Sequence, residues 1–132
     1  MEKEELIREA FKALQNSYSP YSHYPVGAAV SASDGTVIYG ANIENASYPA
    51  GICGERNAVF AAYARGYRKD DITALAIVSR GHTVAAPCGV CRQVLAELLN
   101  RDTPIYLSNG TETIETNMAE LLPMPFGPED LD

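Results

Sequence analysis

The chain has 132 residues, 17 acidic against 10 basic side chains and a formal net charge of -7. This length predicts a single domain over residues 1–132. The acidity favours a small-molecule substrate over nucleic acid, because phosphate binding relies on Lys and Arg. No apolar signal core begins the chain, no segment approaches the roughly 20 apolar residues of a membrane span, and the odd number of cysteines suggests free or metal-bound thiols. These features predict a cytoplasmic protein that does not contact membranes.

The first part of the chain predicts a helix followed by a β-hairpin. Residues 4–16 place their apolar side chains on one stripe, which is typical of a helix that covers a sheet. A polar, aromatic loop with two prolines, residues 17–25, ends this helix. Residues 26–32 and 36–39 predict two strands joined by a turn at Asp34-Gly35, and a loop follows over residues 40–52.

The second part of the chain alternates helices with strands. We expect helices over 54–65 and 88–100, a buried strand over 72–79, strands at 104–107 and 113–115, and a short helix at 117–122 before a proline-rich, extended tail. The middle of the 54–65 helix is apolar nearly all round, which is typical of a central helix that also meets other subunits. The order of elements predicts an α/β fold, a three-layer α/β/α sandwich with a mixed sheet of about five strands.

All three cysteines lie at the predicted starts of two helices. Cys88 and Cys91 are three residues apart and share one helix face, and Cys53 comes directly before the other helix. Helix N-termini carry partial positive charge, which stabilises thiolates. Three protein ligands leave zinc one open position for water, as in catalytic zinc sites. The alternative is a redox pair of Cys88 and Cys91.

Glu55 and Arg56 follow Cys53 in the same helical turn. Glu55 is either a fourth ligand that closes a structural zinc site, as in a partner-binding module, or a proton shuttle beside an open site. A closed site would have to recruit Glu55, His23 or His82, and the histidines show no regular ligand spacing, so the open site is favoured. Three thiolates outweigh the charge of Zn²⁺, and Arg56 is a candidate to compensate. Its alternative is a surface salt bridge.

Two polar side chains in the loop after the hairpin are candidates for substrate binding. Asn42 and Glu44 are two residues apart, so in an extended stretch they point the same way and could bind a diol such as ribose. The alternative, a turn capped by these side chains, is favoured on the residues alone. In the preceding loop, His23 and Tyr24 belong to residue types that pack or line a rim more often than they form a site.

Five stretches of the sequence together form a pattern that is highly specific for one protein family. They are Tyr21-Ser22-His23-Tyr24-Pro25-Val26-Gly27-Ala28-Ala29, Asn42-Ile43-Glu44-Asn45-Ala46, Cys53-Gly54-Glu55-Arg56, Pro87-Cys88-Gly89-Val90-Cys91-Arg92-Gln93-Val94 and Phe126-Gly127-Pro128-Glu129-Asp130-Leu131. With them, nearly the whole chain resembles the small, homotetrameric class of zinc-dependent cytidine deaminases. The resemblance implies one zinc per subunit and hydrolytic deamination of cytidine and deoxycytidine to uridine and deoxyuridine, with release of ammonia, in pyrimidine salvage.

The resemblance also implies how the metal site works. Cys53, Cys88 and Cys91 would hold the zinc, and zinc-bound hydroxide would attack C4 of the base. Glu55 would shuttle protons as the acid/base, and Arg56 would offset the thiolate charge.

Substrate binding follows from the same resemblance. Asn42 and Glu44 would bind the ribose hydroxyls, and Tyr24 stands where the family often has a Phe that packs on the pyrimidine. The backbone N–H of Gly54, where the family usually has Ala, would contact the base. Phe126 would reach into a neighbouring subunit's pocket, so the active sites of a homotetramer would lie at subunit boundaries. The nearest rival is a deaminase of another cytosine compound, such as a nucleoside antibiotic, against which Asn42, Glu44 and Phe126 argue.

Overall fold

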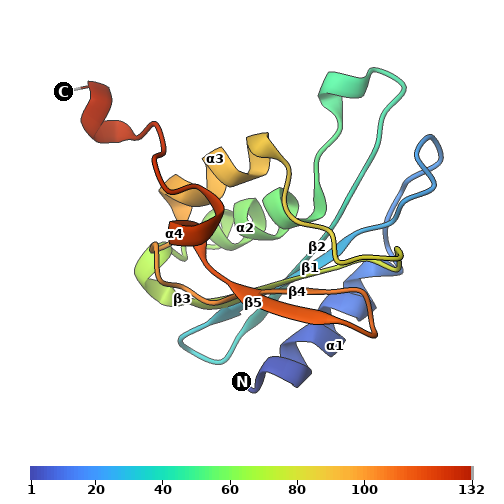
Figure 1. Cartoon of the computed structure of the whole chain (residues 1–132), viewed down its shortest axis with the longest axis horizontal. Coiled ribbons are helices and arrows are strands. Elements are labelled where there is room, and N and C mark those ends of the chain that lie inside the picture. Colours follow the sequence, from blue (N-terminus) through green and yellow to red (C-terminus); the bar gives the residue numbers. More distant parts are fainter. Residues whose placement is uncertain (132) are drawn as a thin grey trace.

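The structure is a computed structural model that describes residues 1–131. Its elements are α1 (Lys3–Leu14), β1 (Gly27–Ala32), β2 (Val37–Ala41), α2 (Gly54–Ala64), β3 (Ile72–Val78), α3 (Gly89–Leu98), β4 (Ile105–Ser108), β5 (Thr113–Thr116) and α4 (Met118–Leu121), with short 3₁₀ turns at Tyr48–Ala50, Lys69–Asp71 and Pro128–Leu131. The strands form one sheet in the order β2-β1-β3-β4-β5 (Figure 1). Only β3 and β4 pair in parallel, and the other neighbours are antiparallel.

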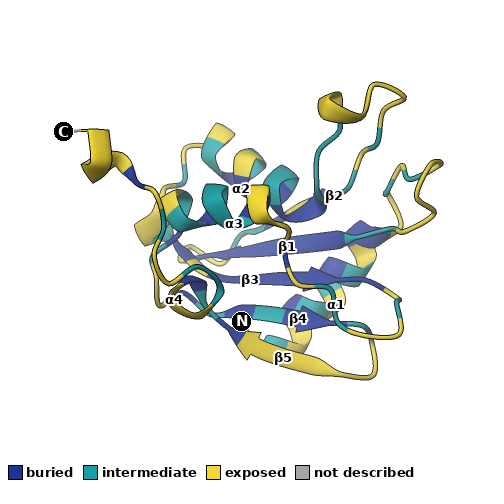
Figure 2. Ribbon diagram, turned by 45° about the horizontal axis from the view of Figure 1, so that its top comes forward, coloured by how far each residue is buried: buried dark blue, intermediate teal, exposed yellow. Residues whose placement is uncertain are grey.

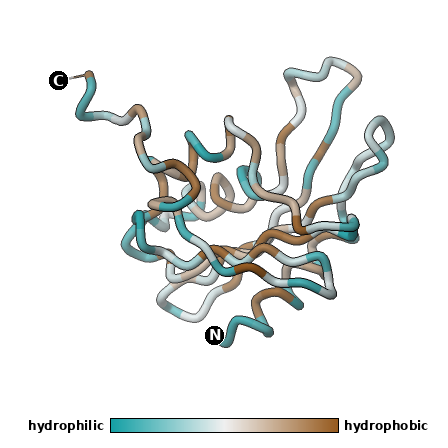
Figure 3. The backbone as a smooth tube through the Cα atoms, in the orientation of Figure 1, coloured by the Kyte–Doolittle hydropathy of each residue, from teal (hydrophilic) through white to brown (hydrophobic). Residues whose placement is uncertain are grey.

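Helices cover both faces of this sheet, which confirms the predicted three-layer α/β/α sandwich. On one face, α1 packs its buried Leu6 and Ala10 against side chains such as Ala76 of β3. On the other face, α2 and α3 cover a larger cluster that includes Leu75 and Leu95. Figure 2 shows β1 and β3 buried between the helical layers, and Figure 3 shows hydrophobic positions concentrated along the central strands. The apolar run of β3 is therefore explained by burial on both faces.

Most element ends lie within two residues of the prediction, and two differences have a clear physical reason. The second strand of the hairpin extends through Gly40 and Ala41, because these residues pair with Ala28 and Gly27 of β1. The tail is not extended to its end, since Pro128–Leu131 forms a 3₁₀ turn. There the Asp130 N–H donates to the Gly127 carbonyl at 2.9 Å, and the Gly127 N–H donates to the Asp130 carboxylate at 2.8 Å.

Helix α2 lies directly on the backbone of β2. A Cβ added at Gly40 would stand 2.3 Å from the Ala58 nitrogen and 2.6 Å from the Gly54 carbonyl oxygen, both in α2. Only glycine allows this approach, and the start of α2, which carries Cys53 and Glu55, is placed by it.

Within residues 1–131, none of the helices has the length and apolar character needed to cross a membrane.

Candidate active site

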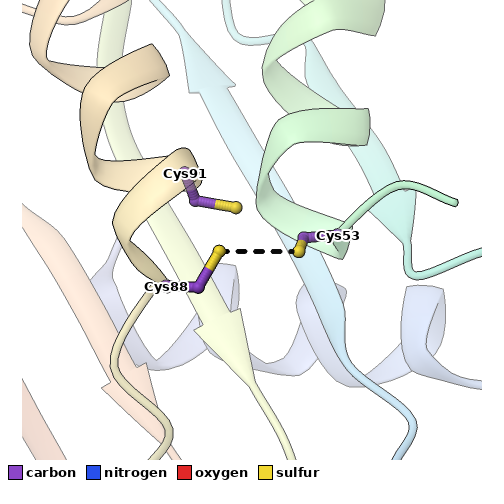
Figure 4. Close-up of side chains that lie close together, drawn as sticks. All are labelled: Cys53, Cys88 and Cys91. Atoms are coloured by element: carbon purple, nitrogen blue, oxygen red, sulfur yellow. Dashed lines mark hydrogen bonds between the residues drawn. The ribbon is translucent and has the colours of Figure 1, made fainter. Parts of the chain in front are cut away.

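Three thiols converge where α2 and α3 begin. Cys53 is the N-cap residue of α2, Cys88 is the N-cap residue of α3, and Cys91 lies in the first turn of α3. Their sulfur atoms all lie within 4.8 Å of one another, and the sulfurs of Cys53 and Cys88 are 3.9 Å apart (Figure 4). This separation is far beyond the S–S bond length of about 2.05 Å, so the three residues are free cysteines.

The donor set fits a zinc ion. Zinc bound to thiolates at about 2.3 Å in tetrahedral geometry places the sulfurs about 3.8 Å apart. The 3.9 Å between the sulfurs of Cys53 and Cys88 agrees with that spacing. Among the described residues, the group of side chains arranged to hold a metal consists of Cys53, Cys88 and Cys91 alone. Neither Glu55, His23 nor His82 belongs to it, which favours three ligands over a closed four-ligand site.

The surroundings of the sulfurs stabilise negative charge at Cys53. The hydrogen bond from the Cys91 thiol, followed by contacts with Arg56 and Cys88, lowers the pKa of Cys53 to about 5. The same hydrogen bond to Cys53, together with burial, raises the pKa of Cys91. The site is therefore built to carry a thiolate, and bringing all three sulfurs to the thiolate state requires a cation among them.

Arg56 supplies positive charge beside this cluster. Its guanidinium donates to the Cys53 sulfur at 3.6 Å. Burial opposes the charge on Arg56, but hydrogen bonds to Cys53 and Cys91 outweigh burial and raise its pKa. Its Nε is buried and has no hydrogen-bond partner among the described residues. The arginine thus lies beside the thiols, and its charge-compensating role stays a prediction.

Glu55 is buried in the first turn of α2, with only 5% of its surface exposed. Burial, reinforced by the negative charge of Cys53, raises the pKa of its carboxyl. A raised pKa makes the carboxylate a stronger proton acceptor than an exposed glutamate, which suits a general acid/base. Gly54 precedes it as the first residue of α2, and a Cβ there would lie 3.1 Å from the Val26 carbonyl oxygen. Alanine would fit at this position only if its neighbours moved slightly.

A pocket of about 460 Å³ opens beside Cys53 and Arg56, and its lining includes Asn42, Glu44 and Ser22. Asn42 and Glu44, the predicted sugar-binding residues, already hold the loop before β1. The Asn42 amide oxygen accepts from the Val26 N–H at 2.9 Å, and its amide nitrogen donates to the Tyr24 carbonyl at 2.9 Å. Asn42 therefore caps the backbone of this loop, as the residues alone favoured, and it also lines the pocket.

Glu44 is held by the same loop. One carboxylate oxygen accepts from the backbone N–H groups of Tyr21 at 3.0 Å and Ser22 at 3.1 Å, and the other accepts from the Ser22 hydroxyl. The Ser22 hydroxyl bond is the main cause that lowers the pKa of Glu44. Glu44 is thus a carboxylate with a defined orientation at the pocket.

The two predicted aromatic site residues lie in different places. Tyr24 is 41% exposed in the loop before β1, and its hydroxyl donates to the Ser79 hydroxyl at 3.2 Å. Phe126 is 59% exposed in the tail, which runs away from the sheet after α4 (Figure 1). The Gln93 side chain holds the Phe126 carbonyl at 2.8 Å. Neither aromatic ring lines the pocket of Asn42 and Glu44.

Ser22 and Ser79 were not predicted as part of the site. Ser22 holds Glu44, and Ser79, which is fully buried, holds Tyr24. Each bond spans a large separation along the chain, so no local spacing could have indicated it. Ser22 lies in one of the stretches that carry the resemblance, but the resemblance gave it no role.

Three thiols on two helix starts, with a buried carboxylate beside them, define a zinc-dependent enzyme of the deaminase type. Residues 1–107 match the family model described as the cytidine and deoxycytidylate deaminase zinc-binding region. The chain belongs to this family, which confirms the predicted family and zinc cofactor.

Cytidine deaminases from other organisms are similar to this chain over nearly its whole length. It is 48% identical over 133 residues to a cytidine deaminase of Halalkalibacterium halodurans, covering 100% of this chain and 99% of that protein. It is also 48% identical to a cytidine deaminase of Sporosarcina psychrophila, covering 99% and 96% of the two chains. The crystal structure of a cytidine deaminase from Burkholderia pseudomallei superposes with a TM-score of 0.92 at 42% identity, covering 96% and 100%.

Proposed function

We propose that the chain catalyses hydrolytic deamination of cytidine and deoxycytidine to uridine and deoxyuridine, with release of ammonia. The observation that carries this proposal is the cluster of Cys53, Cys88 and Cys91 with buried Glu55 in the adjoining helical turn. The relatives that are 48% identical over nearly the whole chain are named cytidine deaminases, which supports the substrate class.

Glu55 is the proton carrier of the proposed reaction. Cys53, Cys88 and Cys91 would hold the zinc, which would supply the Lewis acidity that activates a water as the nucleophile. Glu55 takes a proton from the attacking water and passes it to N3 of the base, which makes C4 more electrophilic. It then takes the proton of the hydroxyl now bonded to C4 and passes it to the amine, so that the C4–N bond breaks, ammonia leaves and the C4 carbonyl forms. The raised pKa of the buried Glu55 carboxyl suits both transfers, because the group must hold and release a proton.

The remaining hydrogen-bonding capacity of Asn42 and Glu44 matches one sugar hydroxyl. The Asn42 oxygen accepts from Val26 and from the Ser17 hydroxyl, and one amide hydrogen is used by Tyr24, so one donor remains. Glu44 has accepted three hydrogen bonds and retains one lone-pair site. One donor and one acceptor together bind a single hydroxyl.

One donor and one acceptor are enough for a sugar with a single secondary hydroxyl, such as deoxyribose, and can also be shared by the two hydroxyls of ribose. This capacity supports acceptance of both cytidine and deoxycytidine. Tyr24 packs on the pyrimidine, and the Gly54 N–H contacts the base.

The active protein is a homotetramer with active sites at subunit boundaries. Phe126 supports this assembly, because it is largely exposed in the tail while its carbonyl accepts a hydrogen bond from Gln93. Tyr48 and Phe60 are further exposed aromatic residues on the outside of the fold. The three free thiols support a location in the reducing cytoplasm, and the products suit pyrimidine salvage.

The first test is ammonia release from cytidine by purified protein, with bound zinc quantified on the same sample. We expect release to scale with zinc content. Glu55→Ala should lower kcat by about 10²–10⁴-fold, the usual contribution of a general acid/base, while zinc stays bound.

Near wild-type turnover by Glu55→Ala would overturn its role. Full zinc occupancy without release from cytidine or deoxycytidine would refute the substrate assignment and favour other cytosine compounds, and then a structural zinc module.

A further inference from the structure

The Ser22 hydroxyl lies between two residues assigned to different parts of the substrate. It donates to the Glu44 carboxylate and accepts from the Tyr24 backbone N–H at 3.1 Å. Glu44 belongs to the proposed sugar site, and Tyr24 belongs to the proposed base site. One hydroxyl therefore joins the carboxylate that binds the sugar to the backbone that carries the aromatic ring.

Both ends of the Tyr24 backbone are held. Its N–H donates to Ser22, and its carbonyl accepts from the Asn42 amide at 2.9 Å. Asn42 and Glu44 therefore fix the loop of residues 17–26 from one side of the pocket, and the Ser22 hydroxyl is the side chain of that loop that bonds to Glu44. Loss of the Ser22 hydroxyl would leave Glu44 with only its two backbone donors, both on the other carboxylate oxygen.

The backbone between Ser22 and Tyr24 is held in an uncommon conformation. His23 has a φ of 54°, and no other non-glycine residue among 1–131 has a positive φ. This left-handed turn lets the Tyr24 N–H point back to the hydroxyl two residues earlier, and the His23 N–H is satisfied by the Ser19 carbonyl at 3.0 Å. Such strain persists only where surrounding contacts hold it and is concentrated at functional sites.

We propose that Ser22 is a positioning residue for substrate recognition, which orients the Glu44 carboxylate toward the sugar and couples it to the placement of the Tyr24 ring. This inference rests on the proposed function of Glu44. Because Oε1 is saturated by two backbone N–H groups, the substrate hydroxyl must use Oε2, the oxygen that Ser22 holds. Without the Ser22 hydroxyl, no protein group holds Oε2, so the orientation of the Glu44 carboxylate is less well defined and water can bind Oε2 instead.

The test compares kcat and KM of the zinc-loaded wild type with those of Ser22→Ala on cytidine and on dideoxycytidine, which lacks both secondary hydroxyls. We expect Ser22→Ala to lower kcat/KM for cytidine about 10-fold, mainly through KM, because it removes a hydrogen bond to a charged group. On dideoxycytidine the loss should shrink to about 2-fold, since Glu44 has no hydroxyl to bind there. Ser22→Thr keeps the hydroxyl and should retain the wild-type kinetics.

Two further variants separate the possible outcomes. Ser33→Ala makes the same substitution in the exposed hairpin turn and should leave the kinetics unchanged. In a Glu44→Gln background, Ser22→Ala should add little, because both changes act on the same sugar contact.

If Ser22→Ala keeps the wild-type kinetics while Glu44→Gln loses kcat/KM, the proposed role of Ser22 is refuted and the sugar site at Glu44 stands. Equal losses on both substrates, or additive losses in the double variant, would show that Ser22 only stabilises the loop. Unchanged kinetics in Glu44→Gln would refute the proposed sugar site, and the role of Ser22 with it.

Discussion

At the scale of single residues, Tyr24 shows how a side chain that differs from its relatives is accommodated. The resemblance places a Phe at this position in many family members, so the hydroxyl needs a partner or water. In the structure the hydroxyl donates to Ser79, whose side chain is fully buried at the end of β3. Tyr24 thereby satisfies a buried polar group while the residue itself stays partly exposed.

We predict that Tyr24→Phe lowers the free energy of unfolding by about 1 kcal/mol, because the buried Ser79 hydroxyl loses its partner. The double variant Tyr24→Phe/Ser79→Ala should recover part of this loss, since no buried hydroxyl is then left without a hydrogen bond. Urea unfolding of the two variants measures both effects.

The kcat/KM of Tyr24→Phe separates the contribution of the Tyr24 ring to activity from that of its hydroxyl. If the ring alone packs on the base, kcat/KM of Tyr24→Phe should stay within about threefold of wild type, because the apolar contact area is kept. A much larger loss would show that the hydroxyl contacts the substrate.

At the scale of secondary-structure elements, the contact between α2 and β2 places the start of α2. The helix backbone rests on Gly40, and both Cys53 and Glu55 lie at the adjoining helix start. Helix α3 brings Cys88 and Cys91 to the same place from the other side. The metal site therefore depends on how closely two helices approach one sheet face.

We predict that Gly40→Ala destabilises the fold by about 3 kcal/mol, because the added methyl group meets helix backbone that cannot move aside as a side chain would. Displacing α2 should also lower the zinc content per subunit. Urea unfolding and metal analysis of the same preparation measure the two effects.

Gly89→Ala is the matched control for stability, since a Cβ at this helix start meets no atom within 4 Å. It should unfold at the wild-type urea concentration or above. A wild-type midpoint for Gly40→Ala would contradict the close contact between α2 and β2.

At the scale of the whole molecule, the tail carries Phe126 outside the pocket of its own chain. Phe126 is exposed and does not line the pocket of Asn42 and Glu44 in its own chain. In the proposed tetramer it serves a neighbour, so each active site would combine Glu55 of one subunit with Phe126 of another. Such sharing can be tested by mixing two different defects.

We predict that Phe126→Ala and Glu55→Ala restore activity to each other when co-expressed with different affinity tags. In a hybrid, a subunit that keeps Glu55 receives Phe126 from the neighbour that lacks Glu55, so one intact site is rebuilt. Turnover per subunit in the purified hybrid should exceed the mean of the two parent variants. Sedimentation should give the mass of four chains.

The control is a mixture of the two separately assembled variants under conditions without subunit exchange. Hybrid turnover equal to the mean of the parents would show that each Phe126 acts within its own chain or not at all.

The sequence by itself determined the local parts of this protein. The alternation of strand and helix patterns predicted the α/β/α fold, and hydrophobic periodicity placed its elements within a few residues. The grouping of the candidate site residues was also predictable, because Cys88 and Cys91 lie on one helical turn and Cys53, Glu55 and Arg56 lie on another. Spacing along a helix fixes which side chains share a face, whatever the rest of the chain does.

Only the tertiary structure decided which of these parts meet. The hydrogen bonds from Ser22 to Glu44 and from Tyr24 to Ser79 join residues 22 and 55 positions apart along the chain. They depend on the pairing of β1 with β2 and β3, which brings the loop of residues 17–26 beside both partners. The extension of β2 through Gly40 was likewise decided by that pairing and by the approach of α2. A linear pattern does not carry strand register or the distance between layers, because both arise from packing of the whole fold.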